Sequence, residues 1–400
     1  MNLLQLAWSY LRASPLGTLL NVLLLALGVG TIGFVVIVNG QIAGSLNRDA
    51  QGVDLVVGAK GSPIQLILTG IFHLDAPTGN VPLKSALELA KDPLIRRVIP
   101  QSLGDNFRGF WIVGTTPDYI DLYHGAYASG RAWNTRMEAV LGAIVAEQTR
   151  LGVGDHFAGS HGLAEGGAVH ANNVYTVTGV LKPTGTVLDR LVLVDTESVW
   201  FVHEGKVSDP DELKVIEDER EVTVLLVQYA TPLAAASLPR KINSETNMQA
   251  ASPALESARL FRMVGVGADV IRAFGGVVLA TAALSLFIAL YHALNERAYD
   301  IAVLRTLGAR RASIALMLVL EALMLAVLGG VLGLLLAHGL AAILASWMQE
   351  QRSLHIDPWA FSAGELWLLL PALLAAAAAA VLPSWRAARA DISATLARRA

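Results

Sequence analysis

A long uncharged stretch near the start of the chain constrains the fold more than any other feature. From Leu16 to Val38 the sequence reads LGTLLNVLLLALGVGTIGFVVIV and contains no charged residue. The hydrocarbon core of a bilayer takes about 20 apolar helical residues, so this stretch is long enough to cross a membrane. It is too long for the hydrophobic region of a signal peptide, and no convincing small-residue cleavage site follows it. We therefore expect a retained transmembrane helix.

Three more stretches are apolar over a similar length. They cover residues 273–294, 312–348 and 366–382, and Pro383 helps to end the last one. The stretch 312–348 is longer than a bilayer requires, so its helix could tilt, break near Gly329 and Gly330, or extend beyond the membrane as a stalk. Hydrophobic residues make up 54% of the chain and charged residues 16%, which is outside the usual range of soluble proteins. The sequence thus predicts four transmembrane helices.

Basic residues near the ends of these stretches predict the orientation, because Lys and Arg are retained on the cytoplasmic side of a membrane. The short loop 349–365 carries only Arg352 against three acidic residues. The other flanks are rich in arginine, with Arg12 before the first stretch, Arg297, Arg305, Arg310 and Arg311 between the second and third, and Arg386, Arg389, Arg398 and Arg399 after the fourth. Both termini are therefore expected in the cytoplasm and the long segment after the first helix outside it.

The predicted fold class is an α-helical membrane protein with four transmembrane helices and an α+β domain inserted between helices 1 and 2. The expected order is a cytoplasmic N-terminus (1–15), transmembrane helix 1 (16–39), the exported domain (40–269), helix 2 (270–294), a cytoplasmic coupling loop (295–311), helix 3 (312–348), a short exported loop (349–365), helix 4 (366–385) and a cytoplasmic tail (386–400). An exported segment of this length is expected to fold as a domain rather than to remain a loop.

Alternating apolar residues and turn residues predict the elements of the exported domain. Strands are expected at 54–57, 139–145, 174–181, 190–194 and 221–227, and helices near 83–90 and 232–247. Between Gly58 and Pro82 a short apolar run is enclosed by Gly and Pro turns and contains His73 and Asp75. This segment could face a partner or substrate, or pack over the core of the domain. Buried apolar stretches are the commoner case, which favours packing.

Histidines are frequent in the exported domain, and neutral imidazole is a common metal ligand. They are His73, His124, His156, His161, His170 and His203, and their spacing matches no known metal motif. The Gly-rich stretch 154–170 holds three of them with Asp155 and Glu165 nearby, so a metal could order it. A solvated loop is the favoured alternative, and we assign no metal ligand and no cofactor to this chain.

The sequence lacks the motifs of several kinds of catalytic and binding site. The chain has no cysteine, so it has no disulfide and no thiolate metal site. It lacks a G-x-S-x-G nucleophile elbow, an H-E-x-x-H pair and a phosphate-binding G-x-x-x-x-G-K-[ST] loop. A formal net charge of -3 gives no sign of nucleic-acid binding. We therefore expect neither catalysis nor nucleic-acid recognition, and ATP with Mg²⁺ is expected in a separate ATPase.

The expected coupling loop reads NERAYDIAVLRTLGARRAS from Asn295 to Ser313. Ile301, Leu304 and Gly308 recur at helical spacing, which gives a short helix an apolar face that could dock into a groove of a partner. Gly308 is expected to end this helix, since glycine readily takes the left-handed conformation. The alternative is a helix lying on lipid headgroups, with its arginines facing phosphate. The charges expected to frame a docked helix are Glu296, Arg297, Asp300 and Arg305.

This loop resembles the FtsX, MacB and LolC/LolE superfamily of ABC permeases, whose pattern is E-R-x-x-E-I-x-x-L-R-x-L-G-A. The matching residues are Glu296, Arg297, Ile301, Leu304, Arg305, Leu307, Gly308 and Ala309, and Asp300 stands where the family commonly has Glu. The segments 14–30, 321–337 and 382–397 are also similar to the family. In the exported domain, 142–157 and 175–195 are similar to its periplasmic core pattern. The resemblance therefore involves all four predicted helices.

The resemblance implies a mechanotransmission permease in a bacterial inner membrane. Two permease subunits, more often identical than different, would bind two ATPase subunits, with a periplasmic adaptor or lipoprotein as a further partner. The machine would export or extract a lipoprotein, lipid or small molecule. An alternative is an FtsX-like scaffold that controls a periplasmic cell-wall hydrolase. Exported domains of FtsX type are usually smaller, which favours the transporter.

Polar and small residues inside the predicted helices are the last candidates. Glu321 is an ionisable acid within the third span, where a charge is costly unless it faces protein or water. It could pair across the bundle, relay movement from the coupling loop, or play a structural role near the interface. Small residues allow close helix contacts, and those expected at a dimer interface are Ala26, Gly30, Gly329 and Gly333. Contact with lipid is the alternative for these residues.

Overall fold

The computed structural model describes residues 3–162, 169–204, 215–217, 219–350 and 357–389. Four residues used in the sequence analysis, Glu165, Arg352, Arg398 and Arg399, lie outside this description, as does the end of the expected cytoplasmic tail. The chain divides into a helical unit, formed by residues 1–42, 264–349 and 355–400, and a second unit formed by 43–263 and 350–354.

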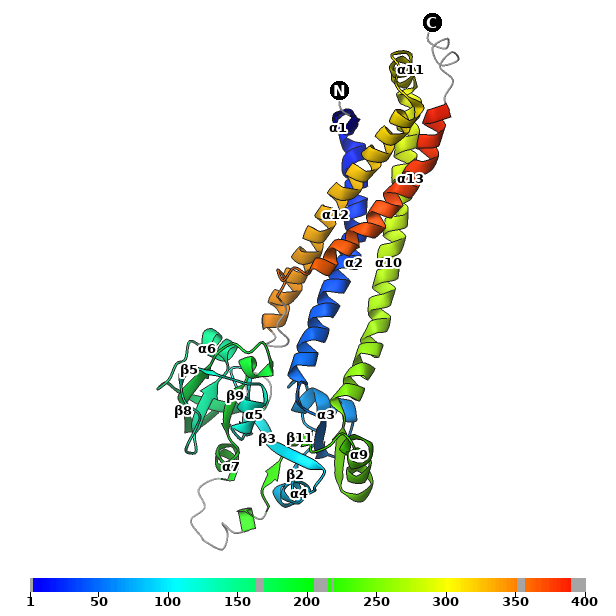
Figure 1. The fold of residues 1–400 in the computed structure, drawn as a ribbon. Helices are drawn as coiled ribbons and strands as arrows, with labels where there is room; N and C mark the ends of the chain where they lie inside the picture. The colour runs from blue at the N-terminus through cyan, green and yellow to red at the C-terminus, as the bar shows by residue number, and fades with distance from the viewer. Residues whose placement is uncertain (1–2, 163–168, 205–214, 218, 351–356, 390–400) are drawn as a thin grey trace. The chain divides into compact units, whose positions relative to one another are not determined.

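Four of the described helices are long and apolar enough to cross a membrane, as the sequence predicts. They are α2 (Pro15–Asp49), α10 (Pro253–Glu296), α12 (Arg311–Glu350) and α13 (Leu369–Arg389). Within the helical unit they run side by side (Figure 1). The short helices α1 (Leu3–Ala13) and α11 (Ala298–Thr306) lie at the same end of this bundle as the last turn of α13. The 3-10 turn η2 (Ala363–Leu368) leads into α13.

The long helices extend past the apolar stretches that reveal them. Helix α12 is continuous through Gly329 and Gly330, so the break considered for this span does not occur. Helix α10 begins at Pro253, well before the expected start near residue 270. Its first turns carry charged residues that lower the hydropathy but support the helix, since Arg259 and Glu256, and likewise Arg272 and Asp269, form ion pairs one turn apart.

The centre of the helical unit is filled by leucine, isoleucine and alanine. Every long helix contributes, which makes these residues one continuous core. Among its most buried members are Leu25, Val29, Ala282, Leu286, Ile301, Ile314, Leu318, Ala322, Ala376 and Ala380.

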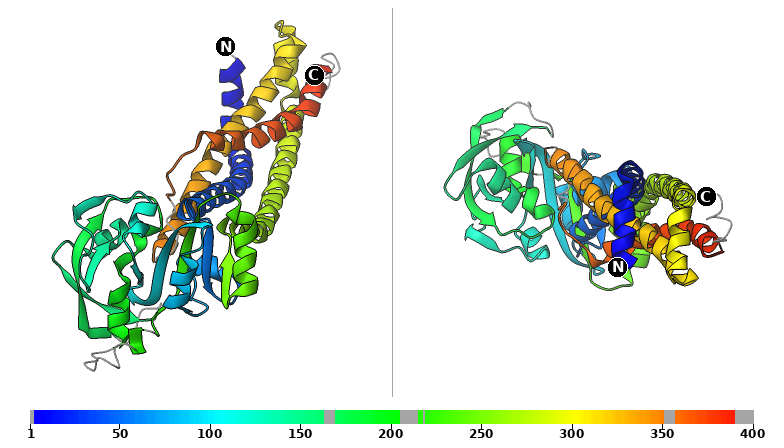
Figure 2. Two further views of the ribbon diagram at one scale, coloured as in Figure 1. Left: turned by 60° about the horizontal axis from the view of Figure 1, so that its bottom comes forward. Right: turned by 90° about the horizontal axis from the view of Figure 1, so that it is seen from above.

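The second unit is built on a ten-stranded mixed sheet with the order β12-β1-β11-β3-β4-β9-β6-β8-β5, while β7 pairs with β3 and β8, and β10 pairs with β2 separately. Figure 2 shows this sheet and its covering helices. The strands are β1 (Leu55–Ala59), β2 (Val81–Pro82), β3 (Ile95–Phe107), β4 (Phe110–Thr115), β5 (Tyr127–Gly130), β6 (Glu138–Leu141), β7 (His156–His161), β8 (Val169–Leu181), β9 (Val192–Asp195), β10 (Glu221–Val222), β11 (Val224–Tyr229) and β12 (Met248–Ala251). The helices are α3 (Pro63–Gly70), α4 (Leu83–Leu89), α5 (Asp118–Leu122), α6 (Ala143–Thr149), η1 (Val187–Arg190), α7 (Thr196–Glu204) and α9 (Ala234–Glu245).

Strand β3 joins two hydrophobic clusters of this unit. One cluster packs helix α9 against the strands around β1 and β11, and Val98 near the start of β3 lies against it. The other cluster packs Phe157 and Tyr175 with Phe107 at the end of β3. The two rings of Phe157 and Tyr175 are stacked with centroids 5.3 Å apart. The long strand therefore ties both halves of the sheet together.

The structure corrects one sequence prediction in this unit and agrees with another. The strand expected at 139–145 ends at Leu141, and α6 begins at Ala143. The turn between them needs Gly142, because a Cβ atom there would lie 2.1 Å from the carbonyl oxygen of Leu188. In the segment 58–82, α3 packs into the unit and Ile71 and Phe72 are fully buried, so packing is the right interpretation of this segment.

Candidate functional site: the coupling segment and its ion pair

The coupling segment, residues 296–309, connects α10 to α12 through the short helix α11. Arg297 is the residue before α11, and the backbone N–H of Leu307 donates to the carbonyl of Val303 in its last turn. Gly308 then takes a φ of +96°. Glycine reaches this left-handed region without the steric cost that a Cβ atom imposes, which explains why the helix ends here.

The two sides of α11 differ in exposure. Ile301 is 4% exposed and belongs to the bundle core, and Leu304 is half-buried. The apolar side marked by helical spacing thus turns inward at Ile301, and docking of this segment on a partner stays a prediction. Leu307, by contrast, is 79% exposed. The remaining exposed members of the predicted set are Glu296, Asp300 and Gly308, while Arg305 and Ala309 are half-buried.

Glu321 is paired, as one of the sequence interpretations proposed. Both of its carboxylate oxygens lie 3.3 Å from Nη1 of Arg297. The other guanidinium nitrogen, Nη2, donates to the carbonyl of Tyr10 at 3.4 Å, and the guanidinium carbon lies 4.1 Å from the centroid of the Tyr10 ring. Arg297 therefore faces the bundle rather than a partner. It joins α1, the coupling segment and a buried residue in the first third of α12 at one point.

The four small residues meet where α2 crosses α12 in the same chain. A Cβ atom on Gly333 would lie 2.8 Å from Cβ of Val29 and 2.9 Å from the carbonyl oxygen of Ala26. One on Gly30 would lie 3.1 Å from the carbonyl oxygen of Gly333, and one on Gly329 would lie 2.6 Å from Cβ of Leu25. These residues form a contact within one subunit, and their use in a dimer interface stays a prediction.

A second polar pair in the helical unit was missed by sequence reasoning. His338 of α12 and Glu365 of η2 are both buried, and Nε2 of His338 lies 2.9 Å from Oε2 of Glu365. The other ring nitrogen lies 2.7 Å from the carbonyl oxygen of Pro358, and the Trp359 ring stacks on the imidazole. A histidine within an apolar helix is the signal that could have found it. The pair fastens the segment before α13 to α12.

The last turn of α2 is anchored inside the second unit. Nη2 of Arg190 lies 3.1 Å from Oδ2 of Asp49, and both residues are buried. Nε of Arg48 donates to the carbonyl of Gly185 at 2.9 Å. The Tyr123 hydroxyl donates to the carbonyl of Asp49. These contacts fix the end of a membrane-spanning helix to η1 and α5.

The histidines of the Gly-rich stretch separate in the structure. The Nδ1 atom of His156 lies 3.1 Å from the hydroxyl of Thr176. His161 and His170 instead gather around the buried Asp105, together with His203. Sequence reasoning did not consider Asp105 and did not group His203 with these two histidines, because the four side chains come from three strands and a helix far apart in the chain. No spacing motif could reveal them.

Comparison with known proteins gives two family matches. The model described as MacB-like periplasmic core domain matches residues 18–258, more than half of the chain, and the one described as FtsX-like permease C-terminal matches residues 272–392. No curated protein matches.

Two solved structures are similar to the chain over about half its length. The periplasmic region of MacB from Actinobacillus actinomycetemcomitans is 11% identical with a TM-score of 0.36, covering 53% of this chain and 95% of that one. The extracellular domain of the noncanonic ABC-type transporter YknZ from Gram-positive bacteria is 14% identical with a TM-score of 0.30, covering 49% of this chain and 98% of that one.

Proposed function

Since the chain belongs to the FtsX/MacB family of ABC permeases, we propose that it couples ATP hydrolysis by a separate ABC ATPase to movement of its periplasmic domain. The chain is a membrane protein with a periplasmic core domain, and members of its family are non-enzymatic membrane subunits. In our proposal it lies in a bacterial inner membrane with both termini in the cytoplasm. A second copy completes the machine, and a periplasmic adaptor or lipoprotein assists it.

One observation carries the proposal: two membrane-spanning helices are joined by short connections to strands that pair with each other. Helix α2 is followed by β1 after residues 50–54, and β12 leads into α10 through Ser252 alone. Strands β1 and β12 are hydrogen-bonded neighbours in the sheet. In this proposal a movement of α2 or α10 is passed to these strands through the short connections. This connection suits a lever better than a pore.

The cytoplasmic end of the lever in this proposal is the exposed side of the coupling segment. Leu307 projects from it, and Glu296 and Asp300 flank it. An apolar anchor within a charged rim is the usual composition of a binding hot spot. The substrate acted on at the other end is a lipoprotein, a lipid or a small molecule, exported or extracted on the periplasmic side. The match to a MacB-like core favours this role over a hydrolase scaffold.

The test is co-purification of the permease with its candidate ABC ATPase. Leu307→Asp places a charge at the anchor and should lower the amount of bound ATPase at least about tenfold, which corresponds to about 1.4 kcal/mol. The matched control is Leu233→Asp, because Leu233 is also 79% exposed but lies in the periplasmic unit. Equal recovery of ATPase with both variants and the parent chain would refute the assignment.

A further inference from the structure

We propose that Asp105, His161, His170 and His203 form a binding site for a divalent transition metal, with Zn(II) as the ion that fits best. One potential ligand atom from each residue lies within 4.8 Å of all the others. The site belongs to the periplasmic unit and does not depend on the coupling segment. It is separate from the proposed coupling to an ATPase.

The sheet explains how the first ligands meet. Strand β7 pairs with β3 in a register that sets His161 opposite Asp105. Side chains of directly opposite residues lie on the same face of an antiparallel pair. The pairing is braced because the Asn106 side chain donates to the carbonyl of Gly162 at 2.7 Å. His170 comes from β8, the strand on the other side of β7, and so it approaches the same point.

His203 completes the group from a helix rather than from the sheet. It lies in the last turn of α7, with its Nε2 atom 3.2 Å from Oδ2 of Asp105. The carboxyl end of a helix carries a partial negative charge, which favours a cation nearby.

The distances fit the face of a tetrahedral metal site. Nδ1 of His161 lies 3.3 Å from Nε2 of His170, and Oδ1 of Asp105 lies 3.3 Å and 3.4 Å from these two nitrogens. Ligands bound to zinc at about 2.0–2.1 Å are separated by about 3.3 Å along each tetrahedral edge. Three ligands thus already have the required spacing, and the ligand atom of His203 lies within 4.8 Å of each of them.

Hydrogen bonding among the four side chains does not account for the cluster. Asp105 is only 1% exposed, yet within the described residues neither carboxylate oxygen accepts a hydrogen bond of good geometry. A buried carboxylate without such bonds is costly. A neutral imidazole has only one N–H, whereas a divalent cation binds the lone pairs of all four ligands at once. Imidazole and carboxylate without thiolate are ligands suited to Zn(II).

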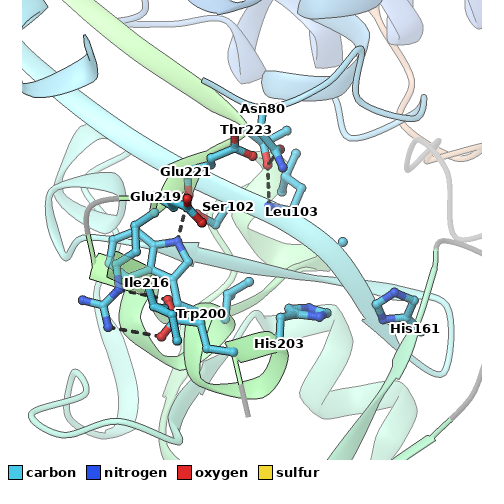
Figure 3. Close-up of a pocket in the computed structure, with 14 residues that line it drawn as sticks. Asn80, Ser102, Leu103, His161, Trp200, His203, Ile216, Glu219, Glu221 and Thr223 are labelled. Atoms are coloured by element: carbon cyan, nitrogen blue, oxygen red, sulfur yellow. Dashed lines mark hydrogen bonds and ion pairs between the residues drawn. The ribbon is translucent and has the colours of Figure 1, made fainter. Parts of the chain in front are cut away.

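The cluster is open to solvent on one side, so a metal could enter and leave. His161 and His203 line a pocket of about 460 Å³ beside β3, together with Ser102 and Trp200 (Figure 3). The His161 side chain is 58% exposed, while Asp105 is buried. The exposed imidazole gives a metal ion in solution a route to the ligands.

The experiment is a titration of the full chain, purified in detergent and stripped with a chelator, with ZnCl₂ in a calorimeter. We expect one saturable site per chain. His161→Gln and His203→Gln should weaken it at least about tenfold. His156→Gln is the matched control, because His156 is a histidine of the same strand as His161 that takes no part in the cluster. Co(II) in place of Zn(II) should give the strong visible absorption of a tetrahedral complex.

Three results would overturn the proposal. They are absence of saturable binding to the parent chain, undiminished binding to His161→Gln, or an equal loss with His156→Gln, which would indicate adsorption to surface histidines. His161 is mostly exposed, so its replacement is expected to leave the fold intact, and circular dichroism checks this. The titration needs no ATPase, so failure of the coupling assignment would leave its outcome unaffected.

Discussion

At the scale of single residues, the role of Arg297 differs between the sequence prediction and the structure. Sequence similarity groups it with the charges that frame a docked helix. In the structure its guanidinium is taken up by Glu321 and by Tyr10, so it stabilises the bundle end of the coupling segment. Glu321 in turn is tolerated within α12 because Arg297 compensates its charge. Neither residue can be understood alone, and they lie too far apart in sequence for spacing to link them.

Replacing Arg297 alone should therefore destabilise the protein more than replacing both Arg297 and Glu321. Arg297→Met leaves the Glu321 carboxylate buried without its partner and should destabilise the protein by about 3–5 kcal/mol. The double variant Arg297→Met with Glu321→Leu removes the orphaned charge and should recover most of that loss. Unfolding in detergent at increasing denaturant measures both. Arg310→Met, the same change at an exposed arginine, serves as the control.

A double variant no more stable than Arg297→Met would show that Glu321 does not depend on this arginine.

At the scale of elements, the contact between α2 and α12 in the helical unit depends on glycine residues, which have no side chain. The crossing of α2 and α12 places backbone atoms of one helix where a Cβ atom of the other would lie. Small residues at helix crossings let backbones approach closely, and dispersion then holds the helices together. The sequence indicates that such a contact exists, because the glycines and Ala26 recur at helical spacing. It cannot indicate whether the partner helix belongs to the same chain.

A single methyl group should test this crossing. Gly333→Ala puts a Cβ atom against Val29 and Ala26, and overpacking of this kind typically costs about 1–3 kcal/mol. Gly339→Ala is the matched control, since it lies in the same helix with no atom within 4 Å of its added Cβ. That change should be neutral, or stabilising by up to about 1 kcal/mol through helix propensity. Thermal unfolding in detergent compares the two. Equal melting temperatures would argue against a tight α2 and α12 contact.

The membrane helices could be predicted from the sequence, whereas strand β3 could not. The four membrane helices were predicted because a bilayer requires a long apolar run, which is a local property. Strand β3 was missed because polar residues interrupt its pattern, and their partners come from elsewhere in the chain: Gln228 accepts from Arg96, and three distant histidines surround Asp105. The metal cluster was unpredictable for the same reason. Whether Ile301 faces the bundle or the solvent also depends on packing, which the local spacing of apolar residues does not determine.

At the scale of the whole molecule, the division near residue 263 in helix α10 falls between the two family matches. The MacB-like match ends at residue 258 and the FtsX-like match begins at residue 272. The MacB-like match also includes residues 18–42 of the helical unit, so the family regions and the two units agree only at this one boundary. In the proposed function, the orientation across the membrane decides which unit faces the ATPase.

Cysteine labelling can establish that orientation, because the chain has no cysteine of its own. Ser244→Cys lies at an exposed position of α9, and Leu307→Cys lies in the exposed coupling segment. A maleimide that cannot cross membranes should label Ser244→Cys in intact spheroplasts and Leu307→Cys only after permeabilisation. The parent chain should remain unlabelled in both conditions. Labelling of Leu307→Cys in intact spheroplasts would reverse the proposed topology.

In the proposed coupling, the pairing of β1 with β12 limits the movements that α2 and α10 could pass to the sheet. Val56 lies opposite Ala251 and Gly58 opposite Gln249, and this register is held by main-chain hydrogen bonds. If α2 and α10 slid lengthwise past each other, the ladder would shift, and a shift of one residue would turn every side chain of a strand to the wrong face of the sheet. A movement that carries both strands together keeps the ladder intact. If the proposed coupling holds, β1 and β12 should therefore move as one pair.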